Sequence, residues 1–175
     1  MSTETIIKVE LATSEALYKG AMAIRKQVFV KEQRIPESKE FDGNDFCAAH
    51  VVAYVQKNNR RLPIGTMRIR FFSDFVKFER MAVIRNFRKT NVAEDIMQYG
   101  LKYVAEKGYR QVYGMCKQEL LPRWQQCGYH EIPGAERIEH HVMVLIPISL
   151  DLKENPGDKN DFASVAFDGF GRALA

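Results

Sequence analysis

The spacing of hydrophobic and polar residues predicts the structure of the first part of the chain. The stretch from Thr5 to Leu11 alternates weakly and is rich in β-branched residues, which predicts a strand. Ser14 is placed to cap a helix, because the apolar residues after it recur near helical spacing as far as about Glu32. Pro36 interrupts this pattern, and the polar run from Glu37 to Asp45 is expected to form a loop.

Three strand-like runs follow one another in the middle of the chain. They are Ala48 to Gln56, Ile64 to Phe72 and Phe75 to Ile84, separated by residues 57–63 and by Ser73-Asp74. Short separators between such runs favour an antiparallel meander.

The remaining pattern alternates between helix and strand. Residues 91–106 carry an apolar helical face, and Gly108 is expected to cap that helix at its C-terminus. Gln111 to Cys116 predicts a strand, Glu119 to Cys127 a short helix, and His141 to Ile148 a further strand. This order of elements predicts the α+β class, with helices flanking a mixed, mostly antiparallel sheet.

The length of 175 residues suits one hydrophobic core, so a single domain is expected over residues 1–150. Beyond Leu150 the chain becomes polar, with Pro156 and Gly157, before a mixed segment that contains phenylalanines. We predict that residues 151–175 form a tail that packs on the domain or extends from it.

Composition narrows the compartment and the partners. No window approaches the roughly 20 apolar residues of a membrane span, and the first residues lack a secretory signal, so a soluble cytoplasmic protein without membrane contact is expected. Cys47, Cys116 and Cys127 contain no CxxC pair, which fits free thiols and neither a disulfide framework nor a metal site. With a net charge of +4, the basic residues come in short groups, which favours a local anion site over a nucleic-acid surface.

One strand-to-helix connection carries the first chemical signal. Met81-Ala82-Val83 ends a predicted strand, and Arg88 to Ala93 leads into the long helix. These residues resemble the pyrophosphate loop of the GNAT acyltransferase superfamily, in which Arg or Gln precedes glycines at a helix start. At such a position, unpaired N–H groups and the positive end of the helix dipole bind phosphate.

The resemblance implies that an acyl-coenzyme A, with acetyl as the expected acyl group, is the donor. It also implies that the backbone of Met81 and Val83 holds the pantetheine arm and polarises the thioester. The implied cofactor-binding residues are Met81, Ala82, Val83, Arg88, Lys89, Thr90, Asn91, Val92, Ala93 and Gln118.

The loop departs from the superfamily pattern at two positions. Asn91 and Lys89 stand where glycine is common, so the backbone approaches a phosphate less freely. Asn91 with Glu94 also forms a capping-box pattern, in which side chains bond the N–H groups that would bind the diphosphate. The alternative that this segment is only a well-capped helix start stays open, although Arg88 and Lys89 supply positive charge.

Two stretches at opposite ends of the predicted domain resemble the ElaA-like branch of the superfamily. The first runs from Ile24 to Gln33 and continues through Pro36 and an acidic loop to His50. The second is Ile138 to Met143. The resemblance covers residues 5–148.

Carboxylates gather around the loop after the first helix. They suit recognition or deprotonation of an amine, although a solvated loop rich in turn formers explains the same residues. Asp42 and Glu79, which adjoins the pantetheine strand, are the candidate catalytic bases. His50 is interpreted as a hydrogen-bonded core histidine. The candidate substrate-binding residues are Arg25, Glu32, Glu40, Asp45 and His140.

The segment from Pro122 to Tyr129 resembles a further superfamily motif. Trp124 lies where many members have a tyrosine that protonates the departing thiolate. An indole is not an acid of useful pKa, so that role is vacant or filled elsewhere. Trp124 is interpreted as packing under the donor site.

Three classes of function stay open from the sequence. The leading hypothesis is an N-acetyltransferase that transfers an acyl group from coenzyme A to a small amine. The spacing of the acidic loop with Arg25, Arg68 and Arg80 also resembles acyl-homoserine-lactone and N-acyl amino acid synthases, which implies an acyl-carrier protein as donor. Lys77 departs from that second pattern, because those enzymes usually carry a glutamate there. The third class is a non-catalytic ligand- or partner-binding protein, and a homodimer is compatible with each class.

Overall fold

The computed structural model describes residues 6–57, 60–140 and 143–152. The chain divides into two units, which share strand β4 (Phe75–Val83) and helix α3 (Val92–Glu106). The first unit contains Met1–Arg70 and Glu79–Leu101, and the second contains Phe71–Phe78 and Lys102–Ala175.

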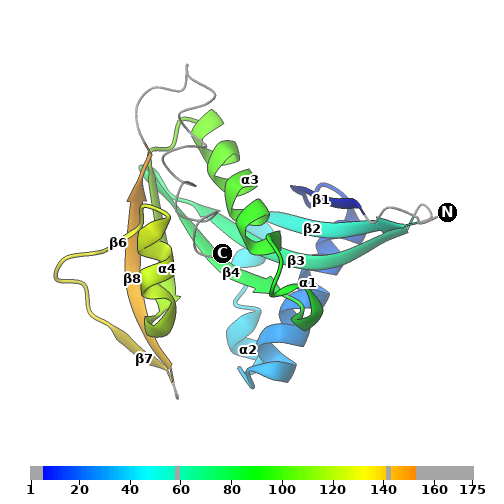
Figure 1. The fold of residues 1–175 in the computed structure, drawn as a ribbon, viewed down its shortest axis with the longest axis horizontal. Coiled ribbons are helices and arrows are strands. Elements are labelled where there is room, and N and C mark those ends of the chain that lie inside the picture. The colour runs from blue at the N-terminus through cyan, green and yellow to red at the C-terminus, as the bar shows by residue number, and fades with distance from the viewer. Residues whose placement is uncertain (1–5, 58–59, 141–142, 153–175) are drawn as a thin grey trace. The chain divides into compact units, whose positions relative to one another are not determined.

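Antiparallel strands form the sheet of the first unit (Figure 1). In spatial order they are β1 (Ile6–Leu11), β2 (Ala49–Lys57), β3 (Arg60–Phe71) and β4. β2 pairs with both β1 and β3 in antiparallel register. Hydrogen bonds from Phe72 N to Phe75 O and from Ile84 N to Ile64 O join β3 and β4, which are also antiparallel. The predicted first strand and the predicted meander over residues 48–84 are confirmed.

β3 begins earlier than its hydrophobic pattern predicts. The sequence predicts a separator over residues 57–63, yet Arg60 already lies in β3. Pro63 stands opposite Tyr54, at a shift in the register between β2 and β3. Such an irregularity accommodates a residue without an N–H donor, which explains why a proline fits inside this strand.

Helix α1 (Glu15–Arg25) begins at its predicted cap, because the Ser14 side chain accepts a hydrogen bond of 3.3 Å from Leu17 N. It continues as a π-helical segment over Lys26–Glu32, which confirms helical structure as far as Glu32. The next polar run is not a loop throughout, which corrects the sequence prediction. It contains α2 (Glu37–Glu40) and a 3-10 turn (Asn44–Cys47). Proline has no N–H donor. Because the first residues of a helix need no such donor, Pro36 is compatible with the turn that follows it.

Helices cover both faces of the first unit's strands (Figure 1). On one face, Leu17 and Ala21 of α1 pack against Val52 and Tyr54 of β2. On the other face lies α3, which follows residues 91–106 as predicted. There Gly65 of β3 permits a close approach, because a Cβ at this position would lie 2.9 Å from Val92 Cγ1 and 2.7 Å from Ile96 Cδ1. This contact fixes where the N-terminus of α3 lies on the sheet.

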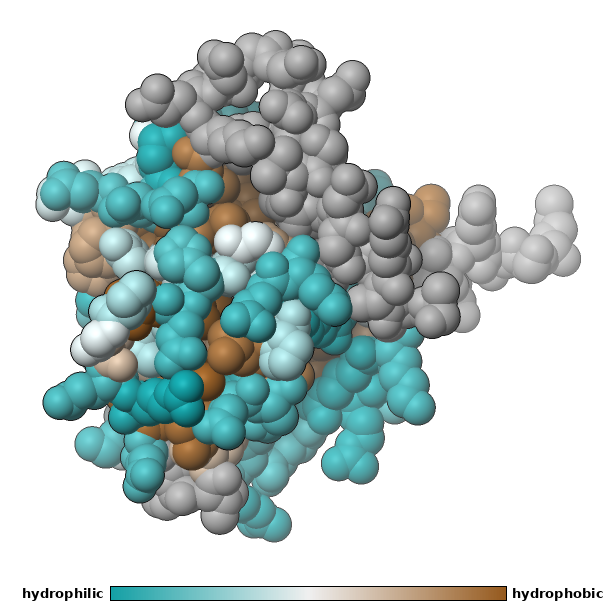
Figure 2. Space-filling view, turned by 60° about the vertical axis from the view of Figure 1, so that its left-hand side comes forward, coloured by the Kyte–Doolittle hydropathy of each residue, from teal (hydrophilic) through white to brown (hydrophobic). Residues whose placement is uncertain are grey.

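The second unit contains the other strands. They are β5 (Gln111–Lys117), β6 (His130–Glu131), β7 (Ile138–His140) and β8 (Met143–Asp151). β5 runs parallel to the first half of β4 and antiparallel to β8, which also pairs with β6 and β7. The predicted strand at 111–116 is confirmed, whereas β6 and β7 were missed because each has only two or three residues. On the face presented in Figure 2, hydrophilic residues predominate and apolar residues appear between them.

The helical features of the second unit follow the sequence. Gly108 ends α3 with a φ of 91°, and its N–H bonds Ala105 O at 2.9 Å, as predicted for a C-terminal cap. A 3-10 turn (Gln118–Leu120) and α4 (Leu121–Gln126) form the predicted short helix. No helix in the described part of the chain is long and apolar enough to cross a membrane.

Only part of the C-terminal prediction falls on residues that the structure describes. β8 extends to Asp151, three residues past the predicted strand end at Ile148, and Leu152 is buried. The rest of the predicted tail, residues 153–175, and His141, where the last strand was expected to start, lie outside the described residues.

The three cysteines are free thiols, as predicted. Cys47 is exposed, whereas Cys116 and Cys127 are buried. Burial raises the pKa of Cys116 to about 11 and that of Cys127 to about 12.

Candidate active site

β4 changes direction at Arg80. This residue has a φ of 54°, a left-handed conformation that costs an L-residue roughly 1–2 kcal/mol. The ladder between β4 and β5 pairs Phe75–Phe78 with Gln111–Gly114, and these residues all lie in the second unit. Beyond the kink, Met81–Val83 complete β4, and the backbone N–H and C=O groups at the edge of a strand can bond an extended ligand.

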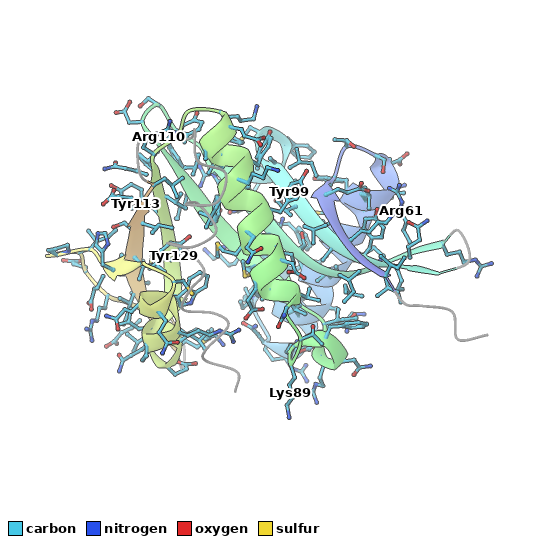
Figure 3. All side chains as sticks on the ribbon, turned by 45° about the horizontal axis from the view of Figure 1, so that its top comes forward. Arg61, Lys89, Tyr99, Arg110, Tyr113 and Tyr129 are labelled. Carbon is cyan, nitrogen blue, oxygen red and sulfur yellow. The ribbon has the colours of Figure 1, made fainter. Side chains whose placement is uncertain are left out.

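The connection from β4 to α3 is braced by Arg88. Its Nε donates a hydrogen bond of 2.8 Å to Val83 O, and one terminal nitrogen lies 2.5 Å from Glu32 Oε2 in the π-helical segment. The Thr90 hydroxyl bonds Phe87 O at 2.7 Å. Lys89 is exposed, and Figure 3 shows it in this connection at the N-terminal end of α3.

The start of α3 corrects the predicted capping box. Asn91 O accepts the first helical hydrogen bond from Asp95 N at 2.8 Å, so Asn91 occupies the N-cap position. Within the described residues, however, its exposed side chain makes no hydrogen bond to the helix. Thr90 Oγ1 lies 3.5 Å from Val92 N and is the closest substitute for a cap. The first-turn N–H groups are therefore not blocked by the Asn91 amide, contrary to the sequence argument.

Seven charged side chains of the first unit form an ionic cluster around Arg25 and Arg68. Arg25 is buried, with Nε 2.5 Å from Glu40 Oε1, one terminal nitrogen on Glu40 O at 2.9 Å and another on the Asp45 carboxylate. The members of the cluster are Arg25, Glu40, Asp42, Asp45, Arg68, Glu79 and Arg80, and Arg70 adjoins it through an ion pair of 3.8 Å with Glu79 Oε1.

Arg68 links three carboxylates from the inner face of β3. Its side chain is 1% exposed and lies 2.7 Å from Asp42 Oδ1, 2.9 Å from Asp45 Oδ1 and 2.5 Å from Glu79 Oε2. Removing one partner from a buried ion pair typically costs about 3–5 kcal/mol, because it leaves an uncompensated charge. The candidates Asp42, Glu79, Arg25, Glu40 and Asp45 thus meet in one place, which sequence spacing alone does not establish.

The carboxyl groups of the cluster differ in basicity. Hydrogen bonds from Arg68 hold the pKa of Asp42 far below its usual value. Burial alone would raise the pKa of Asp45, but hydrogen bonds from Arg25 and Arg68 outweigh it and the net shift is downward. Burial raises the pKa of Glu40, and the neighbouring arginines offset only part of that effect. A carboxylate held as strongly as Asp42 is a weak base, which favours a binding role over deprotonation.

His50 is a core histidine, as interpreted from the sequence. Its Nε2 lies 3.1 Å from Asp45 O, and its ring meets Tyr18 edge-on with centroids 5.2 Å apart. Burial holds the pKa of His50 below its usual value, so the neutral form is favoured. Because Nε2 faces a carbonyl oxygen, it carries the proton in that form.

The remaining sequence candidates are not among the seven residues of the cluster. Glu32 pairs with Arg88, as described above. His140 ends β7, and its side chain lies outside the description. Gln118 opens the 3-10 turn of the second unit. Trp124 packs edge-on against Tyr129 with ring centroids 5.1 Å apart, so it is a packing residue there.

The central position of Arg68 and Arg80 was not predicted. The sequence indicated only that both arginines belong to a spacing pattern that resembles the acyl-homoserine-lactone and N-acyl amino acid synthases. One signal was present: Arg68 stands between the apolar residues Met67 and Ile69, in a stretch of β3 that is buried on both faces. An arginine on an inward position of a strand requires buried carboxylate partners.

Relatives of known name extend these observations. No family model matches the chain. A candidate acetyltransferase of Bacillus subtilis (strain 168), BSU40680, is 35% identical over 141 residues, which cover 79% of this chain and 89% of that protein. YjcF of the same organism, named as an uncharacterized N-acetyltransferase, is 28% identical over 133 residues, covering 76% of this chain and 92% of that protein.

Solved structures share the fold. A candidate N-acetyltransferase from Lactobacillus plantarum superimposes with a TM-score of 0.75 at 22% identity, covering 84% of this chain and 99% of that one. Escherichia coli ElaA gives 0.71 at 22% identity, covering 83% and 100%. BjaI, a coenzyme A-dependent acyl-homoserine lactone synthase, gives 0.68 at 17% identity, covering 96% and 90%. Both resemblances noted in the sequence, to the ElaA-like branch and to the synthases, are confirmed at the level of the fold.

Proposed function

Because the chain belongs to the acetyltransferases of the GNAT superfamily, we propose that it is an N-acyltransferase that transfers an acyl group, acetyl in the first instance, from coenzyme A to a small amine. The observation that carries the proposal is the end of β4. There the strand edge Met81–Val83 and the N-terminus of α3 both border Gly65, since a Cβ at that position would meet Val92 Cγ1 at 2.9 Å and Ala82 O at 3.4 Å.

The donor side uses backbone groups and exposed charge. The edge of Met81–Val83 supplies hydrogen bonds to the extended pantetheine arm. The first-turn N–H groups of α3, with Lys89 beside them, receive the diphosphate. Arg88 is already engaged with Val83 and Glu32, so we assign it to bracing the strand end rather than to the phosphate. Bound acyl-coenzyme A would supply the activated thioester carbonyl.

The acceptor side uses the ionic cluster. Asp42, whose side chain is 28% exposed, is the member best placed to attract a protonated amine from solvent. Its low pKa keeps it charged but makes it a poor base. Glu79, 8% exposed and paired with Arg68, is the remaining candidate base and acts through a water molecule. Trp124 cannot supply a proton to the departing thiolate.

A calorimetric titration of the full chain with acetyl-coenzyme A tests the donor site. We expect saturable binding that Lys89→Ala weakens by about three- to tenfold, because one charge-assisted contact is lost. Lys19→Ala is the matched control, since Lys19 pairs only with Glu15 on the exposed face of α1 within the described residues. The proposal is refuted if the chain does not bind acetyl-coenzyme A and releases no free thiol with any amine.

A second candidate, an N-acyl synthase, is favoured by the ionic cluster itself. The acidic loop and the arginines that resemble the synthases in sequence do meet in space, at Asp42, Asp45, Arg25 and Arg68. An acyl-carrier protein is not a requirement of this class, because BjaI is described as coenzyme A-dependent. Comparing acetyl-coenzyme A, a long-chain acyl-coenzyme A and an acylated carrier protein as donors separates the candidates. Preference for acetyl supports the first, and preference for a long chain or the carrier protein supports the second.

A further inference from the structure

We propose that Arg80 is a positioning residue, whose left-handed backbone, locked by Glu40 and Asp42, sets the donor-binding edge of β4. The inference rests on the proposed function, because the edge that Arg80 sets is the edge proposed to bind the acyl donor. It goes beyond that function by giving part of the ionic cluster a task in donor geometry instead of amine recognition.

The side chain of Arg80 ties the kink to the acidic loop. Its Nε forms an ion pair with Glu40 Oε2 at 2.9 Å without hydrogen-bond geometry, and a terminal nitrogen lies 3.4 Å from Asp42 Oδ2 and 3.2 Å from Lys39 O. Glu40 is 1% exposed and is shared, since its other oxygen faces Arg25 Nε at 2.5 Å. An anchor that is itself buried and paired holds the strained backbone of Arg80 from one side.

The kink also changes the alternation of side chains in β4. In a regular strand, neighbours point to opposite faces, yet Glu79 and Arg80 both reach the ionic cluster. Two residues later, Ala82 packs against Ile24 and Val28 of the helical layer. Arg80 thus behaves as the extra residue of a bulge, which locally disrupts the regular strand before Met81–Val83.

Arg34 supplies an internal comparison. It is the other non-glycine residue with a positive φ among the described residues, at 61°. Within that part of the chain its exposed side chain has no hydrogen bond or ion pair. Arg34 is therefore a left-handed residue of the same unit without such a lock. Its variants measure how much kcat changes when a left-handed conformation alone is relieved.

The first test compares glycine with alanine at position 80. Glycine adopts a positive φ without strain, whereas alanine keeps the strain and lacks the lock. We expect Arg80→Ala to lower kcat with acetyl-coenzyme A, and Arg80→Gly to recover at least about tenfold of that loss, equivalent to about 1.4 kcal/mol. Arg34→Ala and Arg34→Gly are the matched pair and should differ by less than about threefold in kcat. Equal activities of the two position-80 variants would overturn the inference.

The second test asks whether Glu40 acts through the kink. Glu40→Gln should lower kcat in the parent but have a much smaller effect in the Arg80→Gly background, where no lock is needed. An equal effect in both backgrounds would overturn the inference. Denaturant unfolding gives a readout that needs no donor: Arg80→Gly should unfold at a higher midpoint than Arg80→Ala. If the parent neither binds nor transfers an acyl group, the proposed function fails, while the order of these midpoints still decides whether the backbone at Arg80 is strained.

Discussion

At the scale of the residue, the pKa of each carboxyl group depends on the side chains that surround it. Asp42 and Glu40 are two residues apart, yet the pKa of Asp42 falls through hydrogen bonds from Arg68, whereas burial raises that of Glu40. Local sequence contains no information on this difference, because Arg68 lies on a different element. The acidic loop could be predicted as a candidate site, but the division of roles among its carboxylates could not.

The depressed pKa of Asp42 predicts a specific dependence of stability on pH. A group whose folded pKa lies below its unfolded value of about 3.9 stabilises the fold above that value, and this contribution is lost as pH falls toward the folded pKa. Asp42→Asn should therefore lower the free energy of unfolding at neutral pH and flatten its decline below about pH 4. Urea unfolding between pH 2 and 7 checks this, with Asp74→Asn in the exposed β3–β4 turn as control. A decline as steep as that of the parent would show that another group dominates acid unfolding.

Asn91 provides a second prediction at this scale. Its side chain leaves the first-turn N–H groups of α3 uncovered, so Asn91→Gly removes no obstacle to a diphosphate. We expect the Kd for acetyl-coenzyme A to change by less than about threefold, and the free energy of unfolding by a few tenths of a kcal/mol. Calorimetry and urea unfolding measure the two quantities. Tenfold tighter binding would revive the capping-box interpretation, and clearly weaker binding would make the Asn91 amide a ligand.

At the scale of the element, close packing at Gly65 places the N-terminus of α3. Few local signals reveal such a contact, because a glycine inside a strand pattern can indicate a bulge, a bend or a close neighbour. Only the structure shows that the neighbours are Val92 and Ile96 of α3 on one side and Ala82 O on another.

Gly65→Ala should therefore disturb both stability and donor binding. The new Cβ would lie 2.7 Å from Ile96 Cδ1 and 2.9 Å from Val92 Cγ1, so α3 must shift. We expect a loss of about 1–3 kcal/mol in the free energy of unfolding, together with weaker binding of acetyl-coenzyme A. Gly114→Ala in β5 is the matched control, because its nearest contact would be an ordinary 3.5 Å to Phe78 O. Unchanged donor affinity in a folded Gly65→Ala variant would show that the position of α3 does not determine binding of acetyl-coenzyme A.

At the scale of the whole molecule, the element order was predictable and the site was only partly so. The meander over 48–84 and the helix over 91–106 follow from period-two and helical spacing, which are local. Pro63 inside β3, the left-handed Arg80 and the bracing of Val83 by Arg88 depend on partners far away in sequence, so no local pattern encodes them. The loop prediction for residues 37–45 failed for the same reason, since buried ion pairs hold Glu40 and Asp45 in their turns.

The accessibility of the three thiols gives the unmodified chain a practical property. Maleimide reagents attack thiolates, so Cys47, exposed in the 3-10 turn, reacts ahead of Cys116 and Cys127, which are buried with raised pKa values. A brief treatment near neutral pH should attach one fluorophore, two residues from Asp45. Such a conjugate would report occupancy of the acidic loop by amines as a change in emission, without any introduced cysteine.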